Sequence, residues 1–344
     1  MSVLTKSISR ILGLGAFFLF LIAPLYGKEK PSEKMIRVME YNRQTLSLVP
    51  SWLNQESLNT SCATYGLPEI AIQHIDSYIG DEITYSDLIT YLSSFLNSQI
   101  QYLEVGVSVG KNFFQICNYL HKGVVVGMDL ERPNKSLENF FFNRQQLDSW
   151  DSFTPAAVPY DHKEWFRKYG FTSDLLKKRC AGLYRYQAKN LFLRYSYPSR
   201  ENDVYYLSGD ILDESLWEKL GNNAFKFNLV FSDAFHWEDS ILYEYEMLQK
   251  YHLLNEDAFI IVWDDLNEIN AGFDRVWNDL NKMYPRKLYR FVMRTRAWIG
   301  IHEKDLHYVG VIIKPKDDFT AASFLSQIHF LDIIRQDVPN TRLR

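Results

Sequence analysis

The stretch that decides the fold is Ile100-Gln-Tyr-Leu-Glu-Val-Gly-Val-Ser-Val-Gly-Lys-Asn112. An apolar run ends there on Glu104, the glycines Gly106 and Gly110 follow, and a helical pattern then begins. A strand that turns into a helix through glycines lets the backbone approach a ligand closely and aims free helix N–H groups at an anionic group. The carboxylate of Glu104 suits a cationic or hydroxyl-rich group. The stretch therefore indicates a site for a nucleoside cofactor that carries both charges.

Further apolar runs recur along the chain, with helical stretches between most of them. They lie at 123–129, 204–208, 227–233, 258–264, 288–299 and 308–314. Runs this apolar are typical of strands that are covered on both faces of a parallel sheet. We therefore expect a doubly wound, Rossmann-like α/β fold with a mostly parallel, seven-stranded sheet. The last two runs have no long helix between them, which predicts an antiparallel pair at one edge.

Three segments lie around this domain, which spans 99–314 and contains a long insert. Residues 1–30 resemble a signal peptide or membrane anchor, because a basic start precedes the apolar run 11–26. Residues 33–98 are expected to be helical, and 315–344 are expected to form a tail. The interval 132–203 is too long for an ordinary crossover and is rich in aromatic residues. We expect this insert to be helical and to cap a substrate, or else to be a structural excursion or an oligomer contact.

Composition narrows the classes of function. The net charge is −4 and no long basic run occurs, which argues against a nucleic-acid partner. The three cysteines are far apart in sequence and form neither a zinc motif nor a disulfide framework. The net charge gives no specific indication of the substrate.

Three of the expected strands end on carboxylates, at Asp129, at Asp233 and at the pair Asp264-Asp265. The carboxyl ends of parallel strands lie on one edge of a sheet, where such sheets bind ligands. A single aspartate at such a place is often a helix N-cap. The whole set together favours a functional site.

The motif Glu104-Val-Gly106-Val-Ser-Val-Gly110 resembles the first motif of class I S-adenosylmethionine-dependent methyltransferases. The resemblance implies that Asp129, which lies 23 residues beyond Gly106, holds the ribose hydroxyls of that cofactor. It implies that Asp210, in the pair Gly209-Asp210, lies in the loop that meets the adenine.

A narrower resemblance is to the metal-dependent O-methyltransferases, and it is carried by the fourth and fifth strand ends. Leu229-Val-Phe-Ser-Asp233-Ala-Phe-His236 and Phe259-Ile-Ile-Val-Trp-Asp264-Asp265 match their pattern of an aspartate, a basic residue three positions later and an acidic pair. The resemblance implies Mg²⁺ held by Asp233, Asp264 and Asp265, with His236 as the base that takes the proton of a hydroxylated acceptor. Ala234-Phe235 departs from the Gly-Asp of sugar-modifying relatives, and no Asn follows Asp264.

Two other classes of function stay open at this point. A NAD-dependent dehydrogenase also uses a glycine-rich turn, but with the spacing Gly-x-Gly-x-x-Gly. A non-catalytic Rossmann-like binding or exported protein would explain the signal-like start, because S-adenosylmethionine is made in the cytosol. The location of the domain is therefore open between export, membrane anchoring through 11–26 and a cytosol-facing placement.

Overall fold

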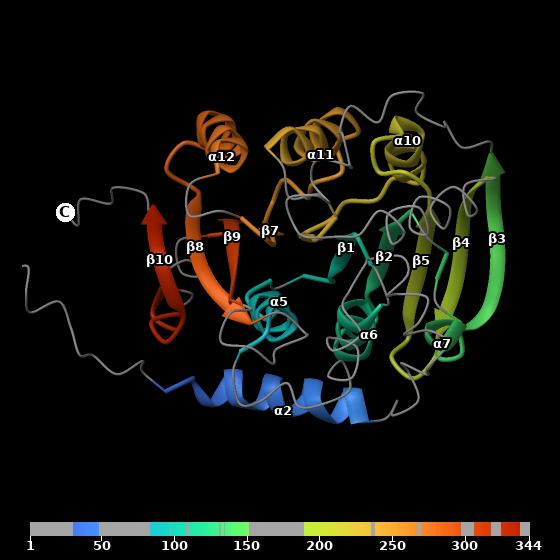
Figure 1. Cartoon of the computed structure of the whole chain (residues 1–344), viewed down its shortest axis with the longest axis horizontal. Helices are drawn as coiled ribbons and strands as arrows, with labels where there is room; N and C mark the ends of the chain where they lie inside the picture. Colours follow the sequence, from blue (N-terminus) through green and yellow to red (C-terminus); the bar gives the residue numbers. More distant parts are fainter. Residues whose placement is uncertain are drawn as a thin grey trace, which may run out of the picture.

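The computed structural model describes residues 30–47, 83–96, 98–107, 110–130, 132–133, 135–150, 189–234, 238–266, 270–296, 306–317 and 325–337. Within them, one ten-stranded sheet has the order β10-β8-β9-β7-β6-β1-β2-β5-β4-β3 (Figure 1). Its strands are β1 (Gln101–Val105), β2 (Val124–Asp129), β3 (Phe142–Trp150), β4 (Asn190–Tyr197), β5 (Asn202–Ser208), β6 (Leu229–Ser232), β7 (Phe259–Trp263), β8 (Tyr289–Arg296), β9 (Leu306–Lys314) and β10 (Asp332–Asp337).

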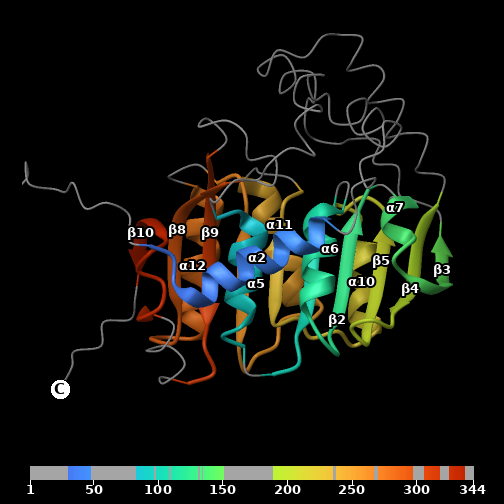
Figure 2. The same ribbon diagram turned by 90° about the horizontal axis from the view of Figure 1, so that it is seen from below.

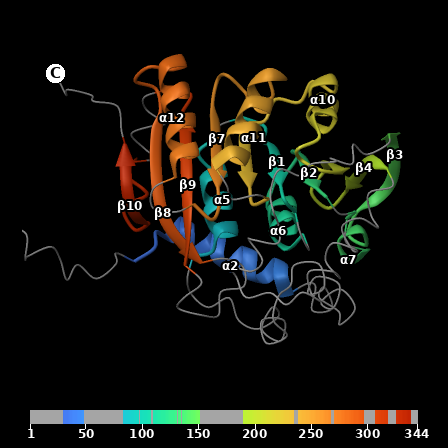
Figure 3. The same cartoon turned by 45° about the horizontal axis from the view of Figure 1, so that its top comes forward.

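The five central strands β5, β2, β1, β6 and β7 are all parallel. They confirm the predicted Rossmann-like, doubly wound core. The antiparallel pairing of β8 with β9 is also confirmed, and β9 pairs in turn with β7. The strand count is ten and not the predicted seven, because β3 and β4 extend one side of the sheet and β10 the other (Figure 3).

Helices cover both faces of the sheet, so each face has its own apolar core. One face packs against α2 (Glu33–Ser47), α5 (Tyr85–Ser93) and α6 (Lys111–Tyr119), and α2 lies across the other two (Figures 1 and 2). The opposite face packs against α10 (Glu214–Asn222), α11 (Glu238–Lys250) and α12 (Ala271–Met283). Side chains of each strand alternate between the two cores, as the pleat requires: Tyr102 points to the first and Leu103 to the second.

The described ends of the insert correct one expectation. After the short helix α7 (Lys135–Glu138), the chain forms β3, which pairs antiparallel with β4, and β4 pairs with β5. The helix predicted for the insert is therefore wrong at this place. Most residues of β3 are polar and exposed, so the sequence lacks the apolar alternation that would indicate a strand. The segment 151–188, which carries the insert's helix-like composition, lies outside the described residues.

The terminal segments agree with the predictions to different extents. The helices α2 and α5 confirm the expected helical character of 33–98 where that region is described. The expected tail 315–344 instead contributes β10 to the sheet. Residues 1–29, which include the apolar run 11–26, lie outside the described residues, and no helix in the described ranges is long and apolar enough to cross a membrane.

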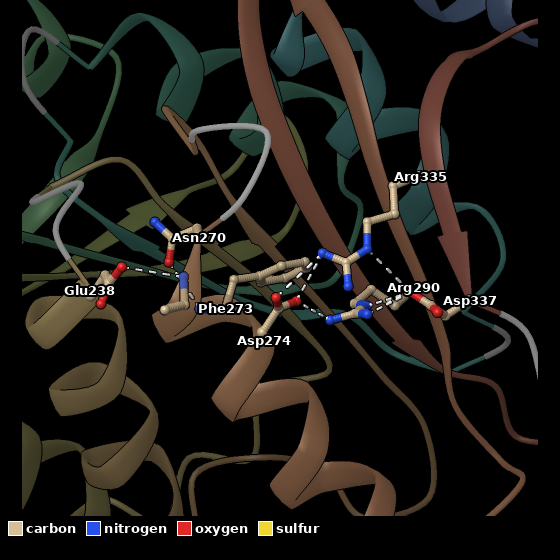
Figure 4. Close-up of polar contacts among 8 residues, drawn as sticks. Glu238, Asn270, Phe273, Asp274, Arg290, Arg335 and Asp337 are labelled. Atoms are coloured by element: carbon tan, nitrogen blue, oxygen red, sulfur yellow. Dashed lines mark hydrogen bonds and ion pairs between the residues drawn. The ribbon is translucent and has the colours of Figure 1, made fainter.

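A buried arginine attaches β10 to the rest of the fold (Figure 4). The side chain of Arg290, on β8, is 5% exposed and pairs with Asp274 of α12 and with Asp337 of β10. Its Nε and Nη2 atoms lie 2.8 and 2.6 Å from Asp337 Oδ2. Its guanidinium also lies over the ring of Trp277, 5.0 Å from the centroid. Arg335 of β10 completes the cluster, with Nη1 3.0 Å from Asp274 Oδ1.

Candidate functional site

The order of the strands along the sheet reverses between the parallel neighbours β1 and β6. The strands β2 and β5 follow β1 on one side, and β7 follows β6 on the other. In open α/β sheets such a switch point opens a crevice at the carboxyl ends of the strands, and ligands bind there. At this place Gly106 follows β1, and Asp233 follows β6 with its N–H bonded to Val105 O at 2.8 Å. The predicted site residues nearest the switch point are therefore these two.

Gly106 has a structural role between two strands that its motif does not indicate. Its φ is +85°, and a Cβ added to it would lie 2.6 Å from the carbonyl oxygen of Asp233 and 2.8 Å from the Cα of Ala234. The close approach that this glycine permits is therefore between two protein backbones. Gly106 fixes the turn after β6, and with it the position of Asp233, against the end of β1.

Gly110 begins the helix that follows. It is the N-cap of α6 with φ +84°, and no side chain caps that helix. A Cβ at Gly110 would lie 2.7 Å from Cδ2 of Leu137, on α7. The predicted strand–turn–helix is confirmed as local structure, while its contact with a cofactor stays a prediction.

Glu104 is the buried polar centre of the site. It is 1% exposed, and its Oε2 accepts hydrogen bonds from Tyr102 Oη at 2.6 Å and from Asn112 Nδ2 at 2.8 Å. Burial raises the pKa of Glu104 to about 8, because desolvation disfavours the charged form more than these hydrogen bonds favour it. The negative charge of Asp129, on the neighbouring strand, contributes to the same rise.

Asp129 ends β2 and is 7% exposed. Its backbone carbonyl accepts the N–H of Gly209 at 2.8 Å, which joins the ends of β2 and β5. Since Asp129 acts electrostatically on Glu104, these two predicted cofactor residues are brought together.

Tyr85 is a site residue that the sequence analysis misses. It lies at the first residue of α5 and is 2% exposed, and its ring centroid is 5.1 Å from that of Phe231 on β6. Its pKa is raised well above the usual value, first by burial and then by the negative charges of Asp233, Asp264, Glu104 and Asp265. The four carboxylates that sequence places at strand ends thus act on one neutral phenol.

A capping box holds Tyr85 in place. Thr84 Oγ1 accepts the N–H of Asp87, and Asp87 Oδ2 accepts the N–H of Thr84. Arg43 of α2 then pairs with Asp87, with Nη2 2.8 Å from Oδ2, although Asp87 is fully buried. The motif Thr-x-x-Asp in the sequence is the one signal for this helix start, and it gives no indication of where the tyrosine points.

The acidic pair after β7 splits between the interior and the surface. Asp264 is 2% exposed, and its N–H bonds to Ser232 O at 3.0 Å. Asp265 is exposed and has a left-handed backbone with φ 49°. Across the described ranges, no group of three or more His, Cys, Asp or Glu side chains is arranged to hold a metal ion. Metal binding by Asp233, Asp264 and Asp265 stays a prediction.

One predicted residue, Asp210, stands apart from this cluster. Asp210 lies after β5, where its Oδ1 accepts the N–H of Leu212 at 3.0 Å. The pKa of Tyr243 on α11 is raised by burial and by the charges of Glu214 and Asp213, and the charge of Asp210 adds to this rise. Its described contacts are thus with the α10–α11 side of the fold. His236, the predicted base, lies outside the described residues.

Comparisons with known proteins give structural matches only. No family model and no curated protein matches the chain. It is similar to a Klebsiella pneumoniae protein provisionally classed as an O-methyltransferase, at 13% identity over 89% of this chain and 97% of that one, with a TM-score of 0.35. It is similar to a Bacillus cereus O-methyltransferase in complex with SAH, at 16% identity over 76% of this chain and 89% of that one, with a TM-score of 0.37. A third match is an SAH-bound methyltransferase from Podospora anserina, at 12% identity over 73% and 89%, with a TM-score of 0.30. A likeness at this level assigns no function to this chain.

Proposed function

We propose that this chain is an S-adenosylmethionine-dependent methyltransferase that methylates a hydroxyl group of a small acceptor. The observation that carries the proposal is the gathering of Glu104, Asp233, Asp264 and Asp265 around Tyr85 at the carboxyl edge of the sheet. This edge is where open α/β sheets bind ligands. A dehydrogenase is disfavoured because the glycines after β1 are four residues apart and lack the Gly-x-Gly-x-x-Gly spacing.

The described residues can take separate roles in such a reaction. S-adenosylmethionine, when bound, supplies an activated methyl group on a sulfonium. Asp129 offers buried carboxylate oxygens to the ribose hydroxyls, and the start of α6, whose N-cap Gly110 has no side chain, offers the positive end of its helix dipole to an anionic group. Tyr85 keeps its proton, because its pKa is held well above the usual value, so its hydroxyl orients neighbours as a donor. Water is excluded from Glu104 and Asp264, which are both buried.

The first test is a calorimetric titration of the purified protein with S-adenosylmethionine. We expect binding to the wild type and a loss of about tenfold to a hundredfold in affinity for Asp129→Ala, since hydrogen bonds to a charged group contribute about 1.5–3 kcal/mol. Asp203→Ala is the matched control. Asp203 lies on β5 in an exposed pair with Arg194, so its removal should leave the affinity unchanged. Absence of binding to the wild type would contradict the proposed function.

The Mg²⁺ requirement needs a separate test. If the resemblance to metal-dependent enzymes extends to this chain, Asp233→Asn should abolish Mg²⁺-dependent turnover and leave the affinity for S-adenosylmethionine largely intact. The amide is nearly isosteric with the carboxylate, and the backbone of Asp233 already packs against Gly106. Turnover on an identified acceptor would be measured with Mg²⁺ and with a chelator. Turnover that survives both the substitution and chelation would rule out the metal mechanism.

A further inference from the structure

The carboxyl group of Glu104 has an unusual set of neighbours for a buried acid. The described side chains that donate hydrogen bonds to it, Tyr102 and Asn112, are both neutral, and the backbone N–H of Phe113 also favours its charged form. Neutral donors offset the cost of burying a negative charge only in part. In the free protein, the arrangement around this carboxyl therefore favours the protonated form.

The titratable groups that interact with Glu104 come from the neighbouring elements β2, α5 and α6 and from β1 itself, whereas β6 places the apolar Phe231 opposite Glu104. Asp129 on β2 disfavours a second negative charge nearby. Tyr85 on α5, Cys117 on α6 and Tyr102 on β1 are neutral groups, whose pKa values are raised in part by the charge that Glu104 carries when ionised. Lys111 is the only charged residue in the sequence of α6 and is buried at its first turn. Once ionised, Glu104 would be a second negative charge beside Asp129, and such a pair suits an incoming positive charge.

Asn112 provides a second observation that points to a ligand. Its Nδ2 donates to Glu104 Oε2 and lies 3.2 Å from Tyr102 Oη, which fixes the orientation of the amide. Its Oδ1 is thereby left without a hydrogen bond among the described residues, although Asn112 is only 4% exposed. A buried acceptor without a donor costs free energy. A ligand that brings a hydrogen-bond donor beside Glu104 would remove this cost.

We propose that Glu104 is the charge-selecting residue of the site, protonated in the free protein and ionised only when a ligand places a cationic group beside it. The O–H bond of the carboxyl breaks, and the proton passes to the solvent buffer. The electron pair stays on the carboxylate, which then faces the cation while Tyr102 and Asn112 continue to donate to it. The inference rests on the proposed function, because S-adenosylmethionine is the cationic nucleoside in question.

The sign of the pH dependence follows from this exchange. Below a pKa of about 8, the binding of a cation must expel the proton, so the affinity of the wild type rises with pH. Relative to Glu104→Gln, which carries no titratable group there, the affinity should rise about tenfold per pH unit between 6.5 and 7.5. Above pH 8 the ratio of the two affinities should level off. The comparison also cancels the titration of the ligand's own amino group.

The experiment is a calorimetric titration of the full chain at pH 6.5, in two buffers that differ in their enthalpy of ionisation. S-adenosylmethionine is one probe, and 5′-methylthioadenosine, an uncharged nucleoside thioether, is the other. We expect release of about one more proton per S-adenosylmethionine bound by the wild type than by Glu104→Gln. We expect no difference between the two proteins with 5′-methylthioadenosine, either in protons or in affinity.

The outcomes separate this inference from the proposed function. Equal proton release by both proteins on binding S-adenosylmethionine would overturn the inference and leave the proposed function standing. Proton release by the wild type with the neutral probe would overturn charge selection. If S-adenosylmethionine binds to neither protein, the proposed function falls, and charge selection for that ligand falls with it.

A measurement without any ligand checks the protonated state itself. The carboxyl of Glu104 has its ordinary pKa of 4.5 when the chain is unfolded and about 8 when it is folded. At a pH between these two values, unfolding releases a proton. The contribution of Glu104 to the free energy of unfolding is therefore fully present below pH 4.5 and is lost as the pH rises towards 8. Urea unfolding from pH 5 to pH 9 should show the wild type losing stability relative to Glu104→Gln up to about pH 8 and no further. A constant difference across this range would overturn the inference.

Discussion

Gly106→Ala is expected to lower the free energy of unfolding by about 3 kcal/mol or more, because two costs add. Alanine must adopt the φ of +85°, which costs about 1–2 kcal/mol for a residue with a Cβ. The new Cβ would also lie 2.6 Å from Asp233 O and 2.7 Å from its carbonyl carbon. These atoms belong to the backbone and do not move aside as the end of a flexible side chain does. The measurement is the urea unfolding midpoint and slope, followed by circular dichroism.

Two other glycines give a graded control for this prediction. Gly110→Ala shares the positive φ, but its new Cβ would meet the end of the Leu137 side chain and not backbone, so a smaller loss is expected. Gly221, in α10, has no positive φ, and its Cβ would lie 3.1 Å from the side chain of Tyr251. Alanine also favours helix over glycine by up to about 1 kcal/mol, so Gly221→Ala should be near neutral. Equal stability of Gly106→Ala and Gly221→Ala would show that the backbones of β1 and β6 are not in close contact.

The Gly106 variant also has a functional readout. Relief of the clash requires the turn at Asp233-Ala234 to move away from the end of β1. A predicted site residue would then shift, even in molecules that fold. Under the proposed function, the affinity for S-adenosylmethionine should therefore fall at a temperature where the variant is still folded.

Arg290→Ala is expected to cost about 1.5–3 kcal/mol of stability, the range for hydrogen bonds to charged groups, because the buried guanidinium bonds to two carboxylates. The substitution removes the buried guanidinium that pairs with both Asp274 and Asp337 and leaves them with Arg335 (Figure 4). It also removes the stacking over Trp277. Because Asp337 lies on β10 and Asp274 on α12, the release of β10 from the sheet should be the first consequence. Hydrogen exchange of the amides of β10, together with urea unfolding, measures both effects.

Arg294 is the matched control for Arg290, since it lies on the same strand and also pairs with β10. Its guanidinium Nη2 lies 2.9 Å from Asp332 Oδ2, but its side chain is 38% exposed. Exposed ion pairs contribute about 0–1 kcal/mol, so Arg294→Ala should cost little. Similar costs for both substitutions would contradict the assignment of the Arg290 cluster as the attachment of β10.

The sequence predicts the central strands well because they are buried on both faces. β6 and β7 are completely buried, and their apolar runs therefore stand out from the surrounding polar sequence. The added strands β3 and β10 give no such signal. β3 is mostly exposed and β10 is half-exposed, so neither shows a run of apolar residues. Their pairing depends on partners that are distant in sequence, which no local pattern reveals.

The residues of the candidate site also differ in how far the sequence predicts their positions. Carboxylates at strand ends are visible in the sequence, because a parallel sheet brings its carboxyl ends to one edge. The contact between Gly106 and Asp233 requires the order of the strands, which the sequence alone does not supply. Tyr85 is buried by the packing of α5 back onto the sheet, and it carries no motif of its own. The sequence shows that Glu104 is acidic, but it does not show that its side chain is buried.

The order of the strands also shapes how this chain emerges from the ribosome. β1 pairs with β2 soon after synthesis, whereas its other neighbour, β6, is made much later, as the pair Leu103 and Val230 shows. At typical rates of synthesis the free edge of β1 waits on the order of ten seconds for β6. An apolar strand edge left open during that interval invites pairing with another nascent chain. The half of the sheet that is made first is therefore the part of this protein with the greatest need of a chaperone.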